Sequence, residues 1–283
     1  MHDALDQYID TIDHLPPSPT VVVKLIALFR QTDPALDDIV SVMSLDPSLT
    51  AEVLKRCNSA SYAGGENVLD VFEAIMRVGF YEVYQTAVAW FGQQAISQTS
   101  SSSGLDPDSL WRHSAITAVA AGQVAQKLGE PAWAGFTAGL LHDIGKIALA
   151  SAEGPKYAAL TAQVGRCGIA LEEGEKASFR FGHGEVGARL LHRWGVPPEI
   201  AMPVCFHHVS AWPEPYARSC AAVNLANVIA HSVEQNEAVT ESDLEAAKPA
   251  MTGLGLISDD FIEIFNQTQT ELAGLKGILS TLG

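Results

Sequence analysis

The chain has 283 residues, and its hydrophobic content of 47% suffices for a buried core in one large domain or two modest ones. Its 17 basic and 33 acidic residues give a formal net charge of -16, which repels nucleic-acid phosphates and anionic membrane surfaces. We therefore expect neither a nucleic-acid polymer nor a membrane as a partner, although a local cationic pocket would still accept a small phosphorylated ligand.

The cysteines are widely spaced and form no C-x-x-C pair, so we expect neither a disulfide framework nor a cysteine-bound zinc ion. This cysteine usage is typical of a reducing cytoplasm. The acidic N-terminus lacks the pattern of a signal peptide, and no run approaches ~20 uninterrupted apolar residues. We expect a soluble, cytoplasmic protein.

Residues 15 to about 95 show apolar residues at helical spacing and almost no strand-like alternation. Asp33-Pro34 and Asp46-Pro47 each place a capping carboxylate before a proline, which predicts two helix starts. The serine-rich segment from Ser97 to Gly104 has the composition of a linker. We therefore predict a helical N-terminal subdomain over residues 1–100.

The rest of the chain also has helical patterning. Residues 101–235 are rich in alanine and glycine, which lets helices approach closely, and Thr240-Glu-Ser-Asp243 is a polar cap for one of the closing helices in residues 236–283. The sequence thus predicts an all-α protein in which the N-terminal subdomain packs on a helical bundle.

The dipeptide His142-Asp143 places an imidazole and a carboxylate side by side at the end of an apolar segment, as in a metal site at a helix end. A helical bundle can bring four more histidines to it: His113, His183, His207 and His208. Neutral imidazoles combined with a carboxylate suit one or two ions of iron, zinc, manganese or cobalt. Such ligation with an open position also activates bound water near neutral pH.

Helical phase decides which histidines point inward, because positions 3, 4, 7 and 11 apart share a face. His113 shares a face with Ile116, and His183 shares one with Leu190, so both should lie on apolar faces. His192 lies nine residues after His183, or roughly 180° around the helix, and should face solvent. We exclude His192 as a ligand.

His207 and His208 are adjacent and so lie about 100° apart on a helix, which lets the pair straddle a pocket. Lys146, three residues after Asp143, is placed to contact a phosphate group. Each feature also has a plainer interpretation: His113 as a core histidine bonded to a backbone carbonyl, the histidine pair as a loop, and Lys146 as a solvated cation at a helix end.

The order of His113, then His142-Asp143, resembles the HD-domain superfamily of metal-dependent phosphohydrolases. His183 and His207-His208 resemble the further ligands of the HD-GYP cyclic-di-nucleotide phosphodiesterases. The resemblance is closer to the HDOD family, the HD-related output domain of bacterial signalling. It covers residues 15 to about 230 and rests on four phrases: Leu15-Pro-Pro-Ser-Pro19, Leu45-Asp-Pro-Ser-Leu-Thr50, Cys57-Asn-Ser-Ala-Ser-Tyr62 and Ala74-Ile-Met-Arg-Val-Gly79.

The sequence departs from the HD enzymes at two places. Asn227, a much weaker ligand, stands where those enzymes carry a late metal-binding aspartate. The segment from Val209 to Tyr216 lacks the Gly-Tyr-Pro of the HD-GYP enzymes, so the resemblance does not support a cyclic-di-GMP phosphodiesterase.

HDOD proteins resemble degenerate HD folds that serve as signalling or interaction modules, and many have lost the metal ligands. This sequence retains the complete histidine and aspartate set described above. The resemblance therefore implies a regulatory module with a retained metal centre. Two alternatives to a regulatory module are open: an active phosphohydrolase in which Asp143 and Lys146 are catalytic, and a histidine cluster without metal. Only about 14 residues precede the resemblance, so we expect input from a signalling protein or a small phosphorylated or nucleotide ligand.

Overall fold

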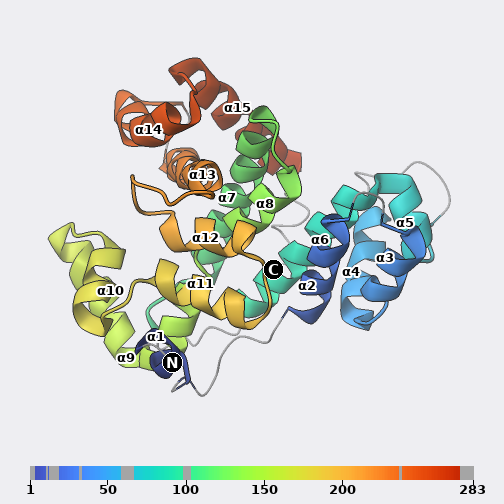
Figure 1. Cartoon of the computed structure of the whole chain (residues 1–283), viewed down its shortest axis with the longest axis horizontal. Coiled ribbons are helices and arrows are strands. Elements are labelled where there is room, and N and C mark those ends of the chain that lie inside the picture. The colour runs from blue at the N-terminus through green and yellow to red at the C-terminus, as the bar shows by residue number, and fades with distance from the viewer. Residues whose placement is uncertain are drawn as a thin grey trace.

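The computed structural model describes residues 4–10, 12, 19–31, 34–58, 67–97, 103–235 and 238–274. Helices dominate these ranges, and no strand occurs within them, which confirms the predicted all-α class. Figure 1 shows a small group of helices, α2 to α5, at one end of the long helix α6, and a larger bundle at the other end.

The small group and its connection comprise α2 (Thr20–Phe29), α3 (Leu36–Met43), α4 (Pro47–Cys57), α5 (Val71–Val78) and α6 (Phe80–Ser97). Helix α4 begins as predicted, because the Asp46 carboxylate accepts hydrogen bonds from the backbone N–H groups of Ser48 and Leu49. The predicted helix start at Pro34 was wrong. Ala35, whose backbone is extended, caps α3 without a side-chain hydrogen bond, and Asp33 lies outside the described residues.

The bundle comprises α7 (Pro107–Lys127), α8 (Ala132–Leu141), α9 (Ile144–Cys167), α10 (Leu171–Phe179), α11 (His183–Arg193), α12 (Pro198–Phe206), α13 (Ala217–Gln235), α14 (Glu241–Leu254) and α15 (Ser258–Gly274). Small residues let α7 and α8 pack tightly: a Cβ on Gly139 would lie 2.7 Å from the carbonyl oxygen of Thr117. Thr240 and Asp243 form the predicted cap of α14.

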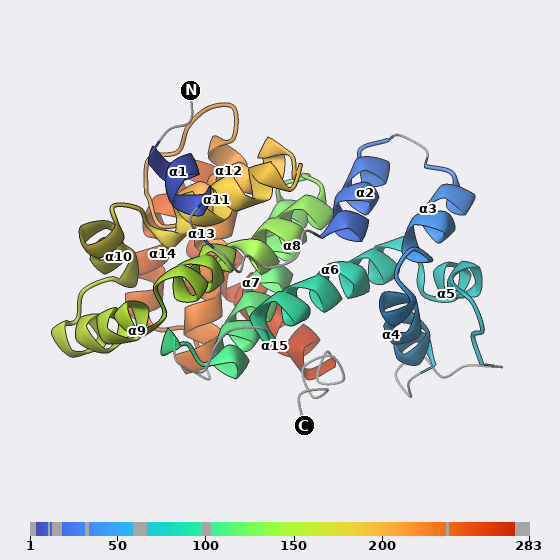
Figure 2. The ribbon, with the colours of Figure 1, turned by 90° about the horizontal axis from the view of Figure 1, so that it is seen from below.

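Helix α6 joins the small group to the bundle, as Figure 2 shows. Tyr84 on α6 and Thr137 on α8 form a buried hydrogen bond of 2.5 Å between their hydroxyls. The Phe29 ring of α2 stacks on Phe80 and contacts Trp133 of α8 at 5.6 Å between centroids. The N-terminal helices therefore pack on the bundle as expected. The boundary near residue 100 falls on residues outside the described ranges, so the division into three parts stays a proposal.

Helix α1 (Ala4–Asp10) lies against α11 of the bundle rather than beside α2 to α5 (Figures 1 and 2). Asp6 contacts Arg189 at 3.4 Å, and Asp10 contacts Arg193 at 2.7 Å. Within the part of the chain that the structure describes, no helix is both long and apolar enough to span a membrane.

Candidate metal centre

His142 and Asp143 lie at the junction of α8 and α9, where His142 ends one helix and Asp143 begins the next. Both side chains are buried. The Nδ1 atom of His142 lies 2.7 Å from the carbonyl oxygen of Gly139. Because a carbonyl only accepts hydrogen bonds, Nδ1 carries the proton, and the Nε2 lone pair faces Asp143.

Glycines bring the start of α11 against the start of α9. A Cβ on Gly145 would collide with the carbonyl oxygen of His183, and one on Gly187 would lie 3.1 Å from the Gly145 nitrogen. This close approach places His183 Nε2 3.3 Å from Asp143 Oδ1. The position of His183 therefore depends on backbone contact that only glycine permits.

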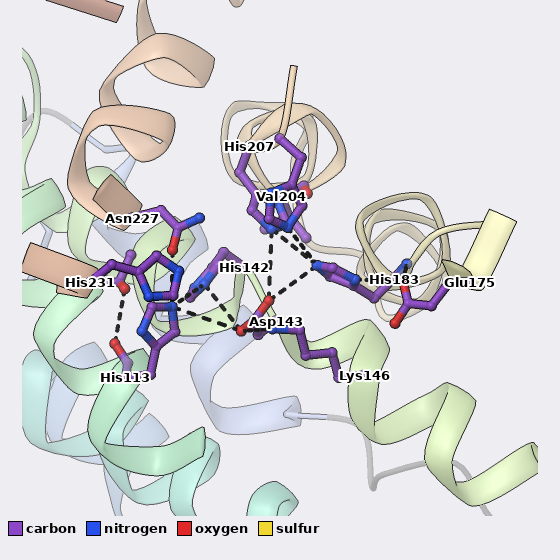
Figure 3. A network of polar contacts seen from close by, with 12 residues as sticks. His113, His142, Asp143, Lys146, Glu175, His183, Val204, His207, Asn227 and His231 are labelled. Atoms are coloured by element: carbon purple, nitrogen blue, oxygen red, sulfur yellow. Dashed lines mark hydrogen bonds and ion pairs between the residues drawn. The ribbon is translucent and has the colours of Figure 1, made fainter. Parts of the chain in front are cut away.

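His207 ends α12, and its ring is held in the same way as that of His142. Its Nδ1–H donates to the Val204 carbonyl oxygen at 2.7 Å, so Nε2 points inward, 3.7 Å from Asp143 Oδ1. Its neighbour His208 is exposed, yet its Nε2 lies 2.9 Å from His183 Nε2. Figure 3 shows His207, His183 and His142 converging on Asp143 from three helices.

His113 completes the set from α7 and is nearly buried. Its Nε2 lies 3.2 Å from His142 Nε2 and 4.0 Å from Asp143 Oδ2. Asp143 therefore stands between two groups of ring nitrogens. Oδ1 faces His183 and His207, whereas Oδ2 faces His113 and His142. All six predicted ligand side chains thus meet in one place, which gives two adjoining candidate sites that share Asp143.

The protonation states suit a cation. Burial lowers the pKa of His207 to about 3 and also lowers the pKa of His142. Burial raises the pKa of Asp143, but contacts with His142 and with the ammonium group of Lys146 outweigh it and hold that pKa well below its usual range. Neutral imidazoles and an ionised carboxylate are the forms that bind metal.

The buried Asp143 Oδ1 is not satisfied by the protein. Although His183 Nε2 lies 3.3 Å away, no hydrogen bond of acceptable geometry reaches this oxygen. An ionised oxygen buried without a partner is costly, and the inward lone pairs of His142 and His207 add further negative potential. The residues present therefore fit one or two divalent ions.

Lys146 and His192 differ in how they relate to the cluster. Lys146 Nζ donates a hydrogen bond of 2.6 Å to Asp143 Oδ2, and its side chain is only 19% exposed, so it is not a solvated helix-end cation. His192 is exposed on the far side of α11, as helical phase predicted.

Glu175 is a site residue that the sequence reasoning missed. It is fully buried on α10 and accepts hydrogen bonds from His183 and from the Tyr157 hydroxyl at 2.6 Å. Burial lowers the pKa of His183, but the nearby Asp143 carboxylate and the hydrogen bond with Glu175 outweigh this effect and raise it. Helical phase could have indicated its burial, because Leu171 and Phe179 lie four residues before and after Glu175 and so share its face of the helix.

Helix α13 contacts His113 through Asn227, which the resemblance aligned with a late metal-binding aspartate, and through Glu234, which the sequence reasoning missed. Asn227 Oδ1 lies 3.0 Å from His113 Nε2, and Glu234 Oε2 lies 3.1 Å from His113 Nδ1. Burial raises the pKa of Glu234, but the hydrogen bond with His113 and the nearby His231 ring outweigh it and lower that pKa to about 2. His113 is thus contacted by an oxygen at each ring nitrogen.

The sequence profile of the HDOD domain matches residues 15–210 of this chain. The chain belongs to the HDOD family. A curated relative, an uncharacterized protein of Treponema pallidum (strain Nichols), is 28% identical over 222 residues. That match covers 77% of this chain but only 42% of the relative, so the chain spans about two fifths of that relative's length.

Solved structures share the fold. An HDOD domain protein of unknown function from Geobacter sulfurreducens matches with a TM-score of 0.77 at 21% identity, covering 99% of this chain and 97% of that one. A proposed phosphohydrolase from Shewanella amazonensis SB2B matches with a TM-score of 0.72 at 22% identity, covering 98% and 96%. A proposed signal transduction protein from Marinobacter aquaeolei VT8 matches with a TM-score of 0.76 at 22% identity, covering 99% and 62%. At these identities the likeness extends to the fold alone.

Proposed function

We propose that this HDOD chain is a regulatory module of bacterial signal transduction, in which a divalent transition metal occupies a retained HD-type centre and the molecule engages a signalling protein. The main evidence for a metal ion is the position of Asp143 between two groups of imidazoles. One of its oxygens faces each group of imidazoles, and the buried Oδ1 lacks a hydrogen-bond partner. His113, His142, Asp143, His183, His207 and His208 are the proposed ligands.

The burial of the centre supports a regulatory role over rapid turnover. His142, Asp143, His183 and His207 are each at most 2% exposed, and among the proposed ligands only His208 is exposed. An ion held this deeply would tie α7, α8, α11 and α12 together, and its binding energy would contribute directly to folding. The signalling assignment of the Marinobacter protein with this fold agrees with such a role.

Lys146 favours a second candidate function, an active metal-dependent phosphohydrolase. Its ammonium group lies 2.6 Å from the bridging carboxylate, where it would also meet the charge of a phosphoryl oxygen beside the cluster. A divalent ion there would supply Lewis acidity and lower the pKa of bound water. Asp143 would hold the ion and Lys146 would orient the substrate, a small phosphorylated compound or nucleotide.

The test is to purify the protein without an affinity tag, measure its metal content, and assay phosphomonoesters, nucleotides and cyclic dinucleotides. Asp143→Ala should abolish metal binding, whereas Asp108→Ala, which removes an exposed aspartate on α7, should retain the wild-type content. Protein that contains metal but shows no turnover dependent on Asp143 would support the regulatory module. Asp143-dependent turnover would establish the phosphohydrolase instead, and wild-type protein that binds no added divalent ion would exclude both.

A further inference from the structure

One face of α13 contacts the His113 ring at both of its nitrogens. Asn227, His231 and Glu234 stand at positions i, i+4 and i+7 of this helix, and so share a face. The ring of His231 stacks on that of His113, with centroids 4.5 Å and planes 30° apart, as Figure 3 shows. Together with the contacts of Asn227 and Glu234, this arrangement surrounds the His113 ring with groups from a single helix.

The two oxygens at His113 differ in charge. Asn227 presents a neutral amide oxygen to Nε2, whereas Glu234 presents a carboxylate to Nδ1 at 3.1 Å. Both oxygens only accept hydrogen bonds and the carboxylate is the stronger acceptor, so with a metal ion in the inner centre the proton of the ring stays on Nδ1. The Nε2 lone pair then points inward, to within 3.2 Å of His142 Nε2.

On the basis of the proposed metal centre, we infer that Glu234 is a positioning residue for His113, and that it compensates for the neutral Asn227. Asn227 stands where HD enzymes carry an aspartate, so the group around His113 lacks one negative charge on the metal side. Glu234 supplies a negative charge behind the ring instead. A carboxylate that accepts the outer N–H of a ligating histidine fixes its orientation and makes it a stronger ligand.

The same three side chains, His113, His231 and Glu234, also lie close enough to hold an outer ion. The geometry favours a hydrogen-bond role, because Glu234 Oε2 already lies 3.1 Å from His113 Nδ1 and 3.6 Å from His231 Nδ1. That oxygen accepts a hydrogen bond from His113, whereas its contact with His231 is an ion-pair distance only. An outer ion is also disfavoured because, with the inner centre filled, His113 would have to bind one ion through each ring nitrogen.

The experiment is a Co²⁺ titration of tag-free protein in competition with a chromophoric chelator. Glu234→Gln keeps an acceptor but removes the charge, and we expect about 10-fold weaker binding; Glu234→Ala should weaken binding by up to about 100-fold. Adding Asn227→Asp to Glu234→Gln should restore most of the lost affinity. The matched control is Glu245→Gln, which removes an exposed carboxylate on α14 and should bind Co²⁺ as the wild type does.

A second measurement separates positioning from general stability. In the Zn²⁺-loaded protein with ¹⁵N-labelled histidine, NMR should show a His113 Nδ1–H proton that exchanges slowly with water, and Glu234→Ala should speed this exchange. Wild-type affinity in both Glu234 variants, while His142→Ala loses Co²⁺, would overturn the inference and leave the metal centre intact. A Glu234→Ala protein that binds one ion fewer, with unchanged affinity for the rest, would also overturn it, in favour of an outer ion. Wild-type protein without Co²⁺ binding would overturn the proposed function itself.

Discussion

Glu175 accepts two hydrogen bonds from His183 through one oxygen: the backbone N–H of His183 donates at 2.7 Å and its Nδ1 lies at 2.6 Å. The same carboxylate therefore caps the first turn of α11 and orients the imidazole that the helix carries. The other oxygen of Glu175 accepts from the Tyr157 hydroxyl on α9. One buried carboxyl group thus connects three helices around the proposed metal centre.

We expect Glu175→Ala to destabilise the protein by about 3 kcal/mol, because it leaves several buried donors without an acceptor. Tyr157→Phe removes a single hydrogen bond from the same group and should cost about 1 kcal/mol. Urea unfolding followed by circular dichroism measures both free energies. Equal losses in the two variants would contradict the role of Glu175 in holding His183.

The contact between α9 and α11 gives a prediction with a control on the same helix. Gly145→Ala introduces a methyl group that collides with the His183 carbonyl, and should destabilise the fold by about 3 kcal/mol and weaken metal binding. Gly165 lies further along α9, where a Cβ meets open space. Gly165→Ala should therefore stabilise the helix by about 0.5–1 kcal/mol. Thermal unfolding with and without Zn²⁺ compares the variants, and a Gly145→Ala protein as stable as the wild type would refute the close approach.

Helical phase was enough to predict which histidines face inward. His113 and His183 lie on buried faces, and His192 faces solvent, because each lies within a regular helix whose apolar stripe the sequence displays. That a bundle brings His207 to His142 was an expectation from the residues which the resemblance strengthened, and phase alone could not secure it, since it depends on how α8 and α12 pack.

The supporting carboxylates were harder to predict. A glutamate in a helix normally faces water, and Glu175 is buried only because Tyr157 and His183 from other helices satisfy it. Glu234 contacts a histidine 121 positions away, a pairing that no local pattern encodes. The place of α1 beside α11 likewise depends on long-range contacts: α1 buries Ile9, and its Asp10 pairs with Arg193.

Removal of the metal should destabilise the protein measurably. An ion present at 100 times its Kd stabilises the folded state by about 2.7 kcal/mol, which for a chain of this size corresponds to a Tm increase of about 5 °C. His207→Ala should lose this response to Zn²⁺, because its Nε2 is one of the inward-facing donors. His192→Ala should keep the full response, since that ring is exposed on α11. Differential scanning fluorimetry before and after chelation supplies the measurement, and a response lost in both variants would argue against a specific centre.

The buried thiol of Cys220 predicts that the folding stability depends on pH even without metal. Burial raises the pKa of Cys220 to about 12, whereas the thiol in the unfolded chain titrates at about 8.5. Above pH 9 the unfolded state therefore releases a proton that the folded state keeps, so this group's contribution to stability is complete below about pH 8.5 and falls as the pH rises toward 12. Between pH 8.5 and 10 we expect wild type to lose on the order of 1–2 kcal/mol of stability more than Cys220→Ala, measured by urea unfolding of the reduced proteins.

Native-state labelling provides an independent check of this burial. At pH 8 iodoacetamide should modify the exposed Cys167 and spare Cys220, and Cys167→Ser should remove the rapid phase of modification. Rapid modification of Cys220 in the folded protein would show that its thiol is not buried as the structure has it.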